Sequence, residues 1–388
     1  MAASKDINLS YFKGTHEKIG IEQGEQFKDL IHLARQILFD SEELQLMEKS
    51  YKKPRFISSD LFVKIAEKLF AFLYMPDIKK FYPEQYKRMT GIAKGANVSL
   101  GFINLMTYCE VELNKVDYVI GGCSCVGIPG QFSANGEPMI IKNFDYPVHF
   151  KELYTTRLDK PKNRFTVLNA SVAPIAGNHD GINEHGLSIT YNYGFGQDKP
   201  TYKVPITIIV QEALETCKTT QEAIDFISSS KRVGGALLMI CDSCGDLRTL
   251  EVSSTLSEQR LPINQLLVNT NHYLTKKMAH IDIPSNAYYS ENNVNALGGK
   301  RFRESSEKRF ERITSLLKDC DKIDEKQLID VFKDHGPENK PSMNSICMHS
   351  DYYSTTCSII FYPFKKKMKI MYDNPCVGKY QELFIPSQ

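Results

Sequence analysis

Hydrophobic residues follow two different periods along the chain, and the change falls near residue 118. Between about residues 15 and 113, apolar residues recur every three or four positions, which is typical of amphipathic helices. We expect one helix to begin near Leu61 after a cap at Ser59 and Asp60, and a short helix at 102–108 after a cap at Ser99. Pro76 is expected to interrupt this helical region.

From residue 118 onward the sequence favours strands, with helices between two groups of them. Short runs rich in β-branched and aromatic residues are separated by turn signals such as Asn135-Gly136. Helices are expected at 205–217, 221–229 and 305–318. Strands are expected at 118–120, 139–142, 165–168, 187–192, 236–241, 247–252 and 266–269, with a final hairpin at 357–362 and 368–371. This order predicts an α+β layered fold.

Composition and charge narrow the class of protein. The 388 residues include 48 Lys+Arg and 46 Asp+Glu, and 42% are hydrophobic, as in an ordinary globular protein. The balanced charge does not favour nucleic acid as a partner. The apolar runs are too short for a transmembrane helix, and residues 1–10 lack the apolar core of a secretory signal. The ten scattered cysteines are therefore expected to be free thiols in a reducing, cytoplasmic compartment.

The most informative stretch is Gly121-Gly122-Cys123-Ser124-Cys125, where the strand region begins. Glycine permits backbone angles that other residues resist, so the Cys123 thiol could fold back onto the carbonyl of Gly122. Attack would move the acyl group from nitrogen to sulfur, and water would release it, leaving Cys123 as a new N-terminus. Its α-amine, with a pKa of about 7.7–8.0, could then accept the thiol proton. A buried packing cysteine is the alternative interpretation of so short a motif.

Polar residues further along the chain could complete such a site. Asp145 lies one hairpin after Cys123 and is expected to fold back beside it, where its carboxylate could orient the new amine. Asn192 and Asn271 carry neutral amide donors suited to a developing oxyanion. Each asparagine taken alone could equally be a turn residue.

In this order, these segments resemble the acyl-CoA:isopenicillin-N (6-aminopenicillanic acid) acyltransferase-like family, related to the choloylglycine hydrolases and acid ceramidase. The resemblance covers most of the chain. It is carried by Lys13-Gly14-Thr15, Gly122-Cys123-Ser124, Asn143-Phe144-Asp145, residues 181–187, Thr270-Asn271-His272, Ser306-Glu307-Lys308-Arg309 and Ser345-Ile346-Cys347-Met348-His349. It implies a four-layer αββα N-terminal-nucleophile hydrolase sandwich with a mostly helical N-terminal segment.

The resemblance also implies a proenzyme that cleaves itself between Gly122 and Cys123. Residues 1–122 would become a small subunit and residues 123–388 a large catalytic subunit, and the two fragments would stay associated. By position, Cys123 matches the family's nucleophile and Asp145 the acid that orients its amine. The oxyanion-side asparagines and the arginine that reaches the nucleophile are matched by Asn192, Asn271 and Arg309.

Three positions leave alternatives open. Lys142 stands where the bile-salt relatives carry an arginine, which is not an equivalent residue, so their substrate preference is not transferred. Cys125 is a rival nucleophile, because its spacing to Asp145 is closer to that of the relatives. Arg312 is a rival of Arg309 on the next helical turn. The possible pocket residues are Lys142, Asn143, Tyr146, Cys125 and His272.

Other reactive residues have simpler explanations. Cys241 and Cys244 form a C-x-x-C between two strand-like runs, without two further metal ligands at suitable spacing, so we expect a hairpin turn. The run 365–367 of three lysines is expected at a solvated hairpin tip. No cofactor or metal is predicted. The mechanism requires none of His149, His179 and His185, which could at most line the pocket.

The sequence therefore predicts a self-processing cysteine amidohydrolase or acyltransferase. Its substrate would be a small molecule with a linear amide bond, such as an N-acyl or peptide-like compound, and its intermediate a thioester. One alternative is a papain-like thiol hydrolase without chain cleavage, using Cys125 or Cys123 with His272. The other is a non-catalytic binding protein that keeps the fold.

Overall fold

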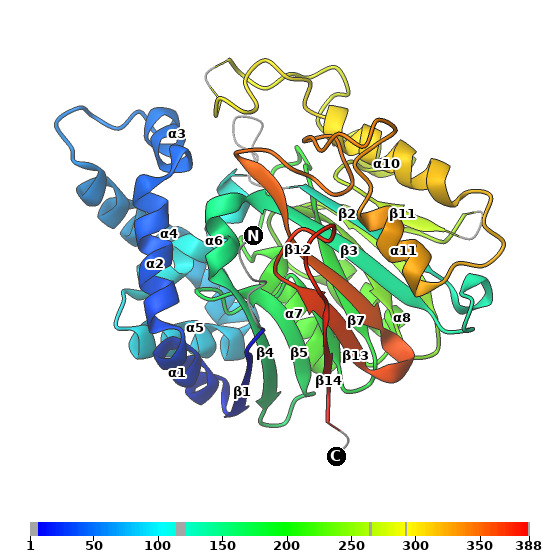
Figure 1. The fold of residues 1–388 in the computed structure, drawn as a ribbon. Coiled ribbons are helices and arrows are strands. Elements are labelled where there is room, and N and C mark those ends of the chain that lie inside the picture. The colour runs from blue at the N-terminus through cyan, green and yellow to red at the C-terminus, as the bar shows by residue number, and fades with distance from the viewer. Residues whose placement is uncertain (1–6, 114–121, 264–265, 292, 387–388) are drawn as a thin grey trace.

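The computed structural model describes residues 7–113, 122–263, 266–291 and 293–386 (Figure 1). Within them the strands form two sheets. The eight-stranded sheet runs in the order β1 (Leu9–Gly14), β4 (Tyr154–Pro161), β5 (Val167–Val172), β6 (Asp180–Asn183), β7 (Ser188–Gly194), β8 (Gly235–Cys241), β9 (Leu247–Val252) and β10 (Ser257–Arg260). The six-stranded sheet runs in the order β11 (Leu267–Asn269), β2 (Gly122–Ile128), β3 (Met139–Pro147), β12 (Tyr353–Tyr362), β13 (Lys367–Met371) and β14 (Gln381–Phe384).

The two sheets face each other and carry helices on their outer faces. Strands β2 and β7 are in contact across the interface between the sheets. Helices α7 (Ile206–Thr216) and α8 (Thr220–Ser229) pack on the eight-stranded sheet, and α10 (Glu304–Leu317) and α11 (Glu325–Phe332) pack on the six-stranded sheet. A four-residue helix, α9 (Lys276–Ala279), contacts β10. The predicted αββα layering is confirmed.

The N-terminal region is helical, as its apolar period predicts, and forms one side of the molecule (Figure 1). Its helices are α1 (His16–Gln26), α2 (Lys28–Asp40), α3 (Glu42–Ser50), α4 (Ser59–Phe81), α5 (Pro83–Ala96) and α6 (Leu100–Leu113). Helices α1 and α5 meet backbone to backbone, since a Cβ on Gly20 would lie only 2.2 Å from the carbonyl oxygen of Arg88. Strand β1 joins this region to the eight-stranded sheet by parallel pairing with β4.

Two details of the helical region differ from expectation, and one is confirmed. Helix α4 begins at Ser59, because Ser58 is the residue whose hydroxyl accepts the N–H of Leu61, at 3.2 Å. Pro76 lies inside α4 and does not end it. Ser99 caps α6 as expected, accepting the N–H of Phe102 at 2.9 Å, but the helix continues beyond 108.

The strand region agrees with the sequence pattern for most of the inner strands. The expected strand at 118–120 lies outside the described residues. The C-x-x-C of Cys241 and Cys244 lies at the β8–β9 turn, and the lysine run 365–367 lies at the β12–β13 connection, as predicted. The cysteines whose side chains are described are free thiols. The elements that the pattern did not identify are β1, β4, β6, β10, β14, α9 and α11.

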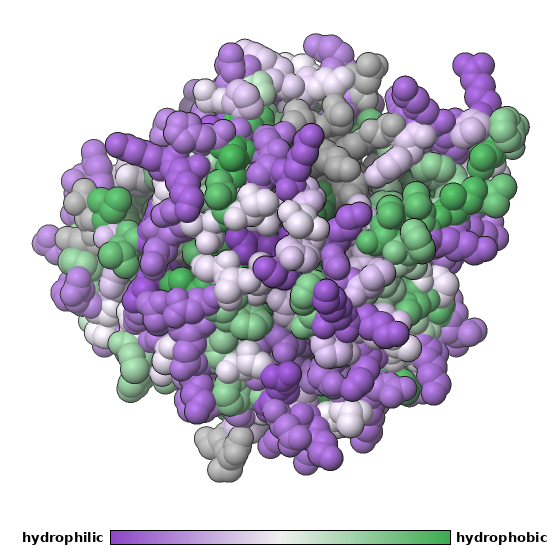
Figure 2. Space-filling model, turned by 180° about the vertical axis from the view of Figure 1, so that it is seen from behind, coloured by the Kyte–Doolittle hydropathy of each residue, from purple (hydrophilic) through white to green (hydrophobic). Residues whose placement is uncertain are grey.

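The outer surface carries an apolar stripe on α4. Leu61, Ile65, Leu69 and Phe72 recur at helical spacing there and are 46–78% exposed. Figure 2 shows hydrophobic residues gathered on the side of the molecule formed by the N-terminal helices. Among the described helices, none has both the length and the apolar character needed to cross a bilayer.

Candidate active site

Antiparallel pairing of β2 and β3 positions the candidate nucleophile. Gly122 pairs with Asp145 and Cys123 with Phe144, so Asp145 does fold back beside the Gly122–Cys123 peptide. Because side chains alternate along a strand, Cys123 and Cys125 both face the core between the sheets, whereas Ser124 faces α10. Cys123 is fully buried in this uncleaved chain.

Hydrogen bonds hold the main chain of Cys123 on both sides. Its N–H donates to Oδ1 of Asn271, which follows β11, at 2.9 Å. Nη1 of Arg309 on α10 donates to the carbonyl oxygen of Cys123 at 2.6 Å and to Oγ of Ser124 at 2.9 Å. Nη2 of Arg309 also donates to Oδ1 of Asn271, at 2.9 Å. Asn271 and Arg309, distant in sequence, therefore meet at Cys123.

Asp145 completes this cluster from β3. Its Oδ1 accepts a hydrogen bond from Oγ1 of Thr355 on β12 at 2.6 Å, and its Oδ2 lies 3.8 Å from Nη1 of Arg309. Burial raises the pKa of Asp145, while Arg309 and Thr355 act to lower it. A Cβ on Gly122 would lie 3.2 Å from Nη2 of Arg309 and 3.4 Å from Oδ2 of Asp145. Glycine is thus the residue that best fits between these two charged groups.

A buried ion pair lies near the Cys123 thiol. Nζ of Lys142 lies 2.7 Å from both carboxylate oxygens of Asp180, and it donates to the carbonyl oxygen of Tyr191 at 2.6 Å. The same carbonyl is 4.0 Å from Sγ of Cys123. Burial raises the pKa of Cys123 to about 12, and the positive charge of Lys142 opposes this rise. Sequence reasoning missed Asp180, although a lysine in a buried strand signals that a carboxylate must be near.

Four further candidates have contacts of their own. Nδ2 of Asn192 donates to the carbonyl of Thr270 at 3.2 Å. Asn143 faces α11 and donates to the carbonyls of Phe332 and Ile346, at 3.0 Å each, so its contacts are structural and it does not line the pocket described below. The ring of Tyr146 stacks on that of Phe144 in the core between the sheets, with centroids 5.0 Å apart. Arg312 pairs with Asp334 at 2.7 Å, so Arg309 is the arginine that contacts Cys123.

The residues of the papain-like alternative have other partners. Sγ of Cys125 lies 3.4 Å from Oγ1 of Thr190, and burial raises the Cys125 pKa to about 12. Nδ1 of His272 lies 2.7 Å from Oγ of Ser306. Burial and nearby arginines lower the pKa of His272 to about 3. Within the described residues, no hydrogen bond joins His272 to either cysteine, so the thiol–imidazole pair of that mechanism is absent from this arrangement.

A cleft reaches the cluster from the side of Gly122. Its volume is about 490 Å³ including its open mouth. Its wall combines apolar and aromatic side chains with a few polar ones. The lining residues are Gly122, Phe195, Asn271, Tyr289, Leu297, Phe302, Arg303, Ser305, Ser306, Arg309, Met343, Met348 and Tyr353. None of His149, His179 and His185 lines it. The cleft therefore meets the main chain at the residue before Cys123.

These features define a class: a four-layer α+β protein with a buried cysteine held at the start of an inner strand. The sequence model of the family named acyl-coenzyme A:6-aminopenicillanic acid acyl-transferase matches residues 132–376, and the chain belongs to this family. The matched segment includes Asp145, Asn192, Asn271 and Arg309 and begins after Cys123. The predicted family is confirmed.

Comparison with solved structures gave distant matches. The Caenorhabditis elegans ortholog of N-acylethanolamine-hydrolyzing acid amidase is 16% identical over 68% of this chain and 100% of its own, with a TM-score of 0.43. Penicillin V acylase from Agrobacterium tumefaciens is 15% identical over 64% and 82%, with a TM-score of 0.39. The C2A mutant of conjugated bile acid hydrolase from Clostridium perfringens is 14% identical over 68% and 97%, with a TM-score of 0.36. No curated protein matched the sequence.

Proposed function

We propose that this chain cleaves itself between Gly122 and Cys123 and then acts as a cysteine amidohydrolase or acyltransferase. The observation that carries the proposal is the convergence of Asn271, Arg309 and Asp145 on that one peptide. A structural cysteine needs no buried guanidinium on its carbonyl, and burying such a group is costly unless it is paired.

The groups around the peptide support a route for self-cleavage. The Cys123 thiol adds to the carbonyl carbon of Gly122, the C–N bond breaks as the C–S bond forms, and the thiol proton passes to the departing nitrogen. Water then adds to the thioester, which yields the Gly122 carboxylate and restores the thiol. Asn271 accepts a hydrogen bond from the departing nitrogen, and Arg309 holds the next carbonyl in place. Asn271 is therefore a catalytic candidate and Arg309 a positioning residue.

Cleavage also connects the cleft to the nucleophile. In the uncleaved chain, Gly122 is part of the cleft wall and Cys123 lies behind it, fully buried. Once the Gly122–Cys123 bond is broken, the free end of the small fragment can move aside, which would expose the thiol and the new α-amine to the cleft. The amine remains near Oδ1 of Asn271 and near Asp145, which together favour its protonated form once it has accepted the thiol proton. Asn192 remains a candidate oxyanion donor, on β7 next to Tyr191.

The cleft suggests the class of substrate. Phe195, Leu297, Phe302, Met343 and Met348 offer an apolar surface for an acyl group, which agrees with the acyl transfer in the family's name. The substrate amide would then be attacked by Cys123, and the acyl group would pass to water or to an amine. The two fragments would stay together, because β1 is a strand of the sheet that the large fragment builds.

Paired cysteine variants test the proposal. Cys123→Ala should remain one chain near 44 kDa on a denaturing gel and should not be labelled by a thiol-reactive acyl analogue. Cys125→Ala is the matched control, because Cys125 is equally buried on the same strand face, and it should split and be labelled normally. Normal splitting of Cys123→Ala, or loss of splitting only in Cys125→Ala, would refute the proposal.

A further inference from the structure

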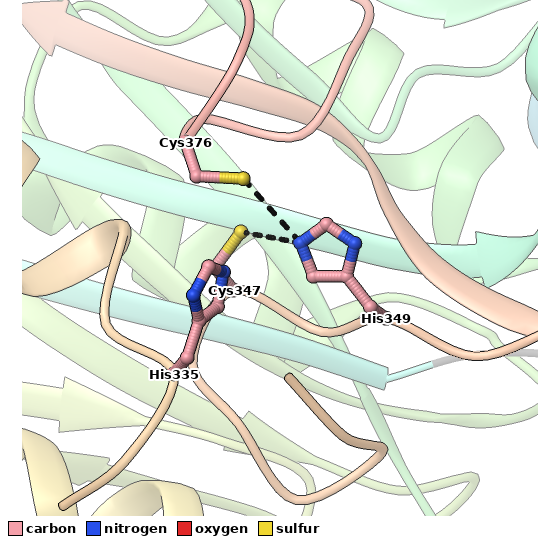
Figure 3. A group of neighbouring side chains, drawn as sticks. All are labelled: His335, Cys347, His349 and Cys376. Atoms are coloured by element: carbon pink, nitrogen blue, oxygen red, sulfur yellow. Dashed lines mark hydrogen bonds between the residues drawn. The ribbon is translucent and has the colours of Figure 1, made fainter. Parts of the chain in front are cut away.

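Four potential metal ligands meet at one point outside the candidate active site. They are His335 and His349, Cys347 and Cys376, and their ligand atoms all lie within 4.8 Å of one another (Figure 3). His335 follows α11, Cys347 and His349 precede β12, and Cys376 follows β13. Three segments that are separate in sequence therefore contribute to the cluster.

The distances fit a single tetrahedral ion. Sγ of Cys347 and Sγ of Cys376 each lie 3.4 Å from Nε2 of His349. In a tetrahedral zinc site, with Zn–S of about 2.3 Å and Zn–N of about 2.0–2.1 Å, neighbouring sulfur and nitrogen ligands lie about 3.5 Å apart. Two distances in the cluster therefore already match a tetrahedral site, and all of its ligand atoms lie within 4.8 Å of one another.

Hydrogen bonding alone satisfies these side chains poorly. Figure 3 shows both thiols directed at the same ring nitrogen of His349, and a neutral imidazole nitrogen has one lone pair to offer. Nε2 of His335 is buried without a hydrogen-bond partner among the described residues. A metal ion would give each of these atoms a partner.

We propose that His335, Cys347, His349 and Cys376 bind one Zn²⁺ ion. Two thiolates and two imidazoles form a ligand set that suits zinc, whereas Mg²⁺ and Ca²⁺ prefer oxygen ligands. Two thiolates also balance the charge of the ion, so the filled site is neutral in its partly buried position. Four protein ligands leave no open coordination position, which makes the site structural.

The site is connected to the candidate active site through one residue. Met348 lies between the ligands Cys347 and His349 and is one of the residues that line the cleft. Its N–H donates to Oγ1 of Thr355 at 2.8 Å, and Oγ1 of Thr355 donates to Asp145 at 2.6 Å. Zinc binding would thus fix the loop that orients Asp145 and forms part of the cleft wall.

Metal analysis tests the proposal directly. Protein purified without chelators should contain about one zinc ion per chain, as measured by elemental mass spectrometry. The double variant Cys347→Ser/Cys376→Ser should contain close to none. Cys244→Ser/Cys320→Ser is the matched control, because both thiols lie outside the cluster and are at least partly exposed, and it should keep its zinc. Zinc-free wild type, or equal zinc in both double variants, would overturn the proposal.

A second measurement avoids dependence on the folding of the variant. Titrating wild-type protein with an organic mercurial should release zinc, and protein reconstituted with Co²⁺ should show the visible absorption of a tetrahedral thiolate site. A disulfide between Cys347 and Cys376 in a non-reducing digest would contradict the assignment. The Cys123→Ala variant should keep its zinc, so this result does not depend on the proposed catalytic activity.

Discussion

The contacts of Arg309 allow the loss of folding free energy on its replacement to be predicted. Arg309 is 2% exposed, donates hydrogen bonds to Cys123, Ser124 and Asn271, and lies 3.8 Å from Asp145. Arg309→Met removes all these bonds and leaves Asp145 without its nearest positive charge. Breaking a buried charge pair in this way costs about 3–5 kcal/mol of folding free energy.

This cost sets the expected fall in the melting temperature. An unfolding entropy of about 2.1 cal/mol/K per residue gives about 0.8 kcal/mol/K for 388 residues, so the melting temperature should fall by about 4–6 °C. Self-cleavage should slow by about 10²-fold, the loss expected when reacting groups are misplaced by about 1 Å.

Arg312→Met is the matched control. Arg312 lies on the next turn of α10 and pairs with Asp334, with 29% of its side chain exposed. A surface pair of this kind contributes about 0–1 kcal/mol, so its loss should lower the melting temperature by about 1 °C at most and leave cleavage unchanged. Thermal denaturation and timed denaturing gels measure both quantities. Cleavage of a folded Arg309→Met at the wild-type rate, or equal effects of the two variants, would refute the reasoning.

Three further predictions concern self-cleavage at the Gly122–Cys123 peptide. Gly122→Val should slow splitting far more than Gly122→Ala, because its methyl groups must enter the space between Arg309 and Asp145; equal rates on timed gels would contradict this. Since burial raises the Cys123 pKa to about 12, the thiolate fraction, and with it the splitting rate, should rise close to tenfold per pH unit from about pH 6 to about pH 9. A splitting rate that falls as the pH is raised, measured after a pH jump, would contradict this prediction. His272→Gln should keep splitting and turnover within about tenfold, whereas a papain-like enzyme would lose them almost entirely in the same assay.

Local patterns predicted the part of the site that one hairpin builds. Asp145 could be placed beside Cys123 because antiparallel pairing after a turn brings together residues that are close in sequence. Asn271 and Arg309 arrive from distant segments. Residue type alone made Asn271 one of several possible donors, and only the resemblance to the family's motifs indicated Arg309. Spacing alone could not distinguish Cys125 from Cys123 or Arg312 from Arg309. For the arginines, the distinction depends on which of them contacts the Cys123 main chain.

The features that the sequence did not reveal depend on contacts between distant segments. Asp180 reaches Lys142 across the interface between the sheets, and no spacing rule relates two such strands. The cluster of His335, Cys347, His349 and Cys376 has no regular spacing, whereas the more familiar C-x-x-C at 241–244 lies in a hairpin turn. Pro76 remains within α4 although proline disfavours helix interiors; it is itself exposed, while Met75 and Ile78 beside it are buried.

The most direct measurement is Edman sequencing of the large fragment, together with its intact mass, in protein that turns over an amide substrate. The account predicts that this fragment begins with Cys-Ser-Cys, at Cys123, and that the small fragment ends at Gly122. A first residue at Cys125 or elsewhere, or an active preparation made only of the unbroken 388-residue chain, would contradict it.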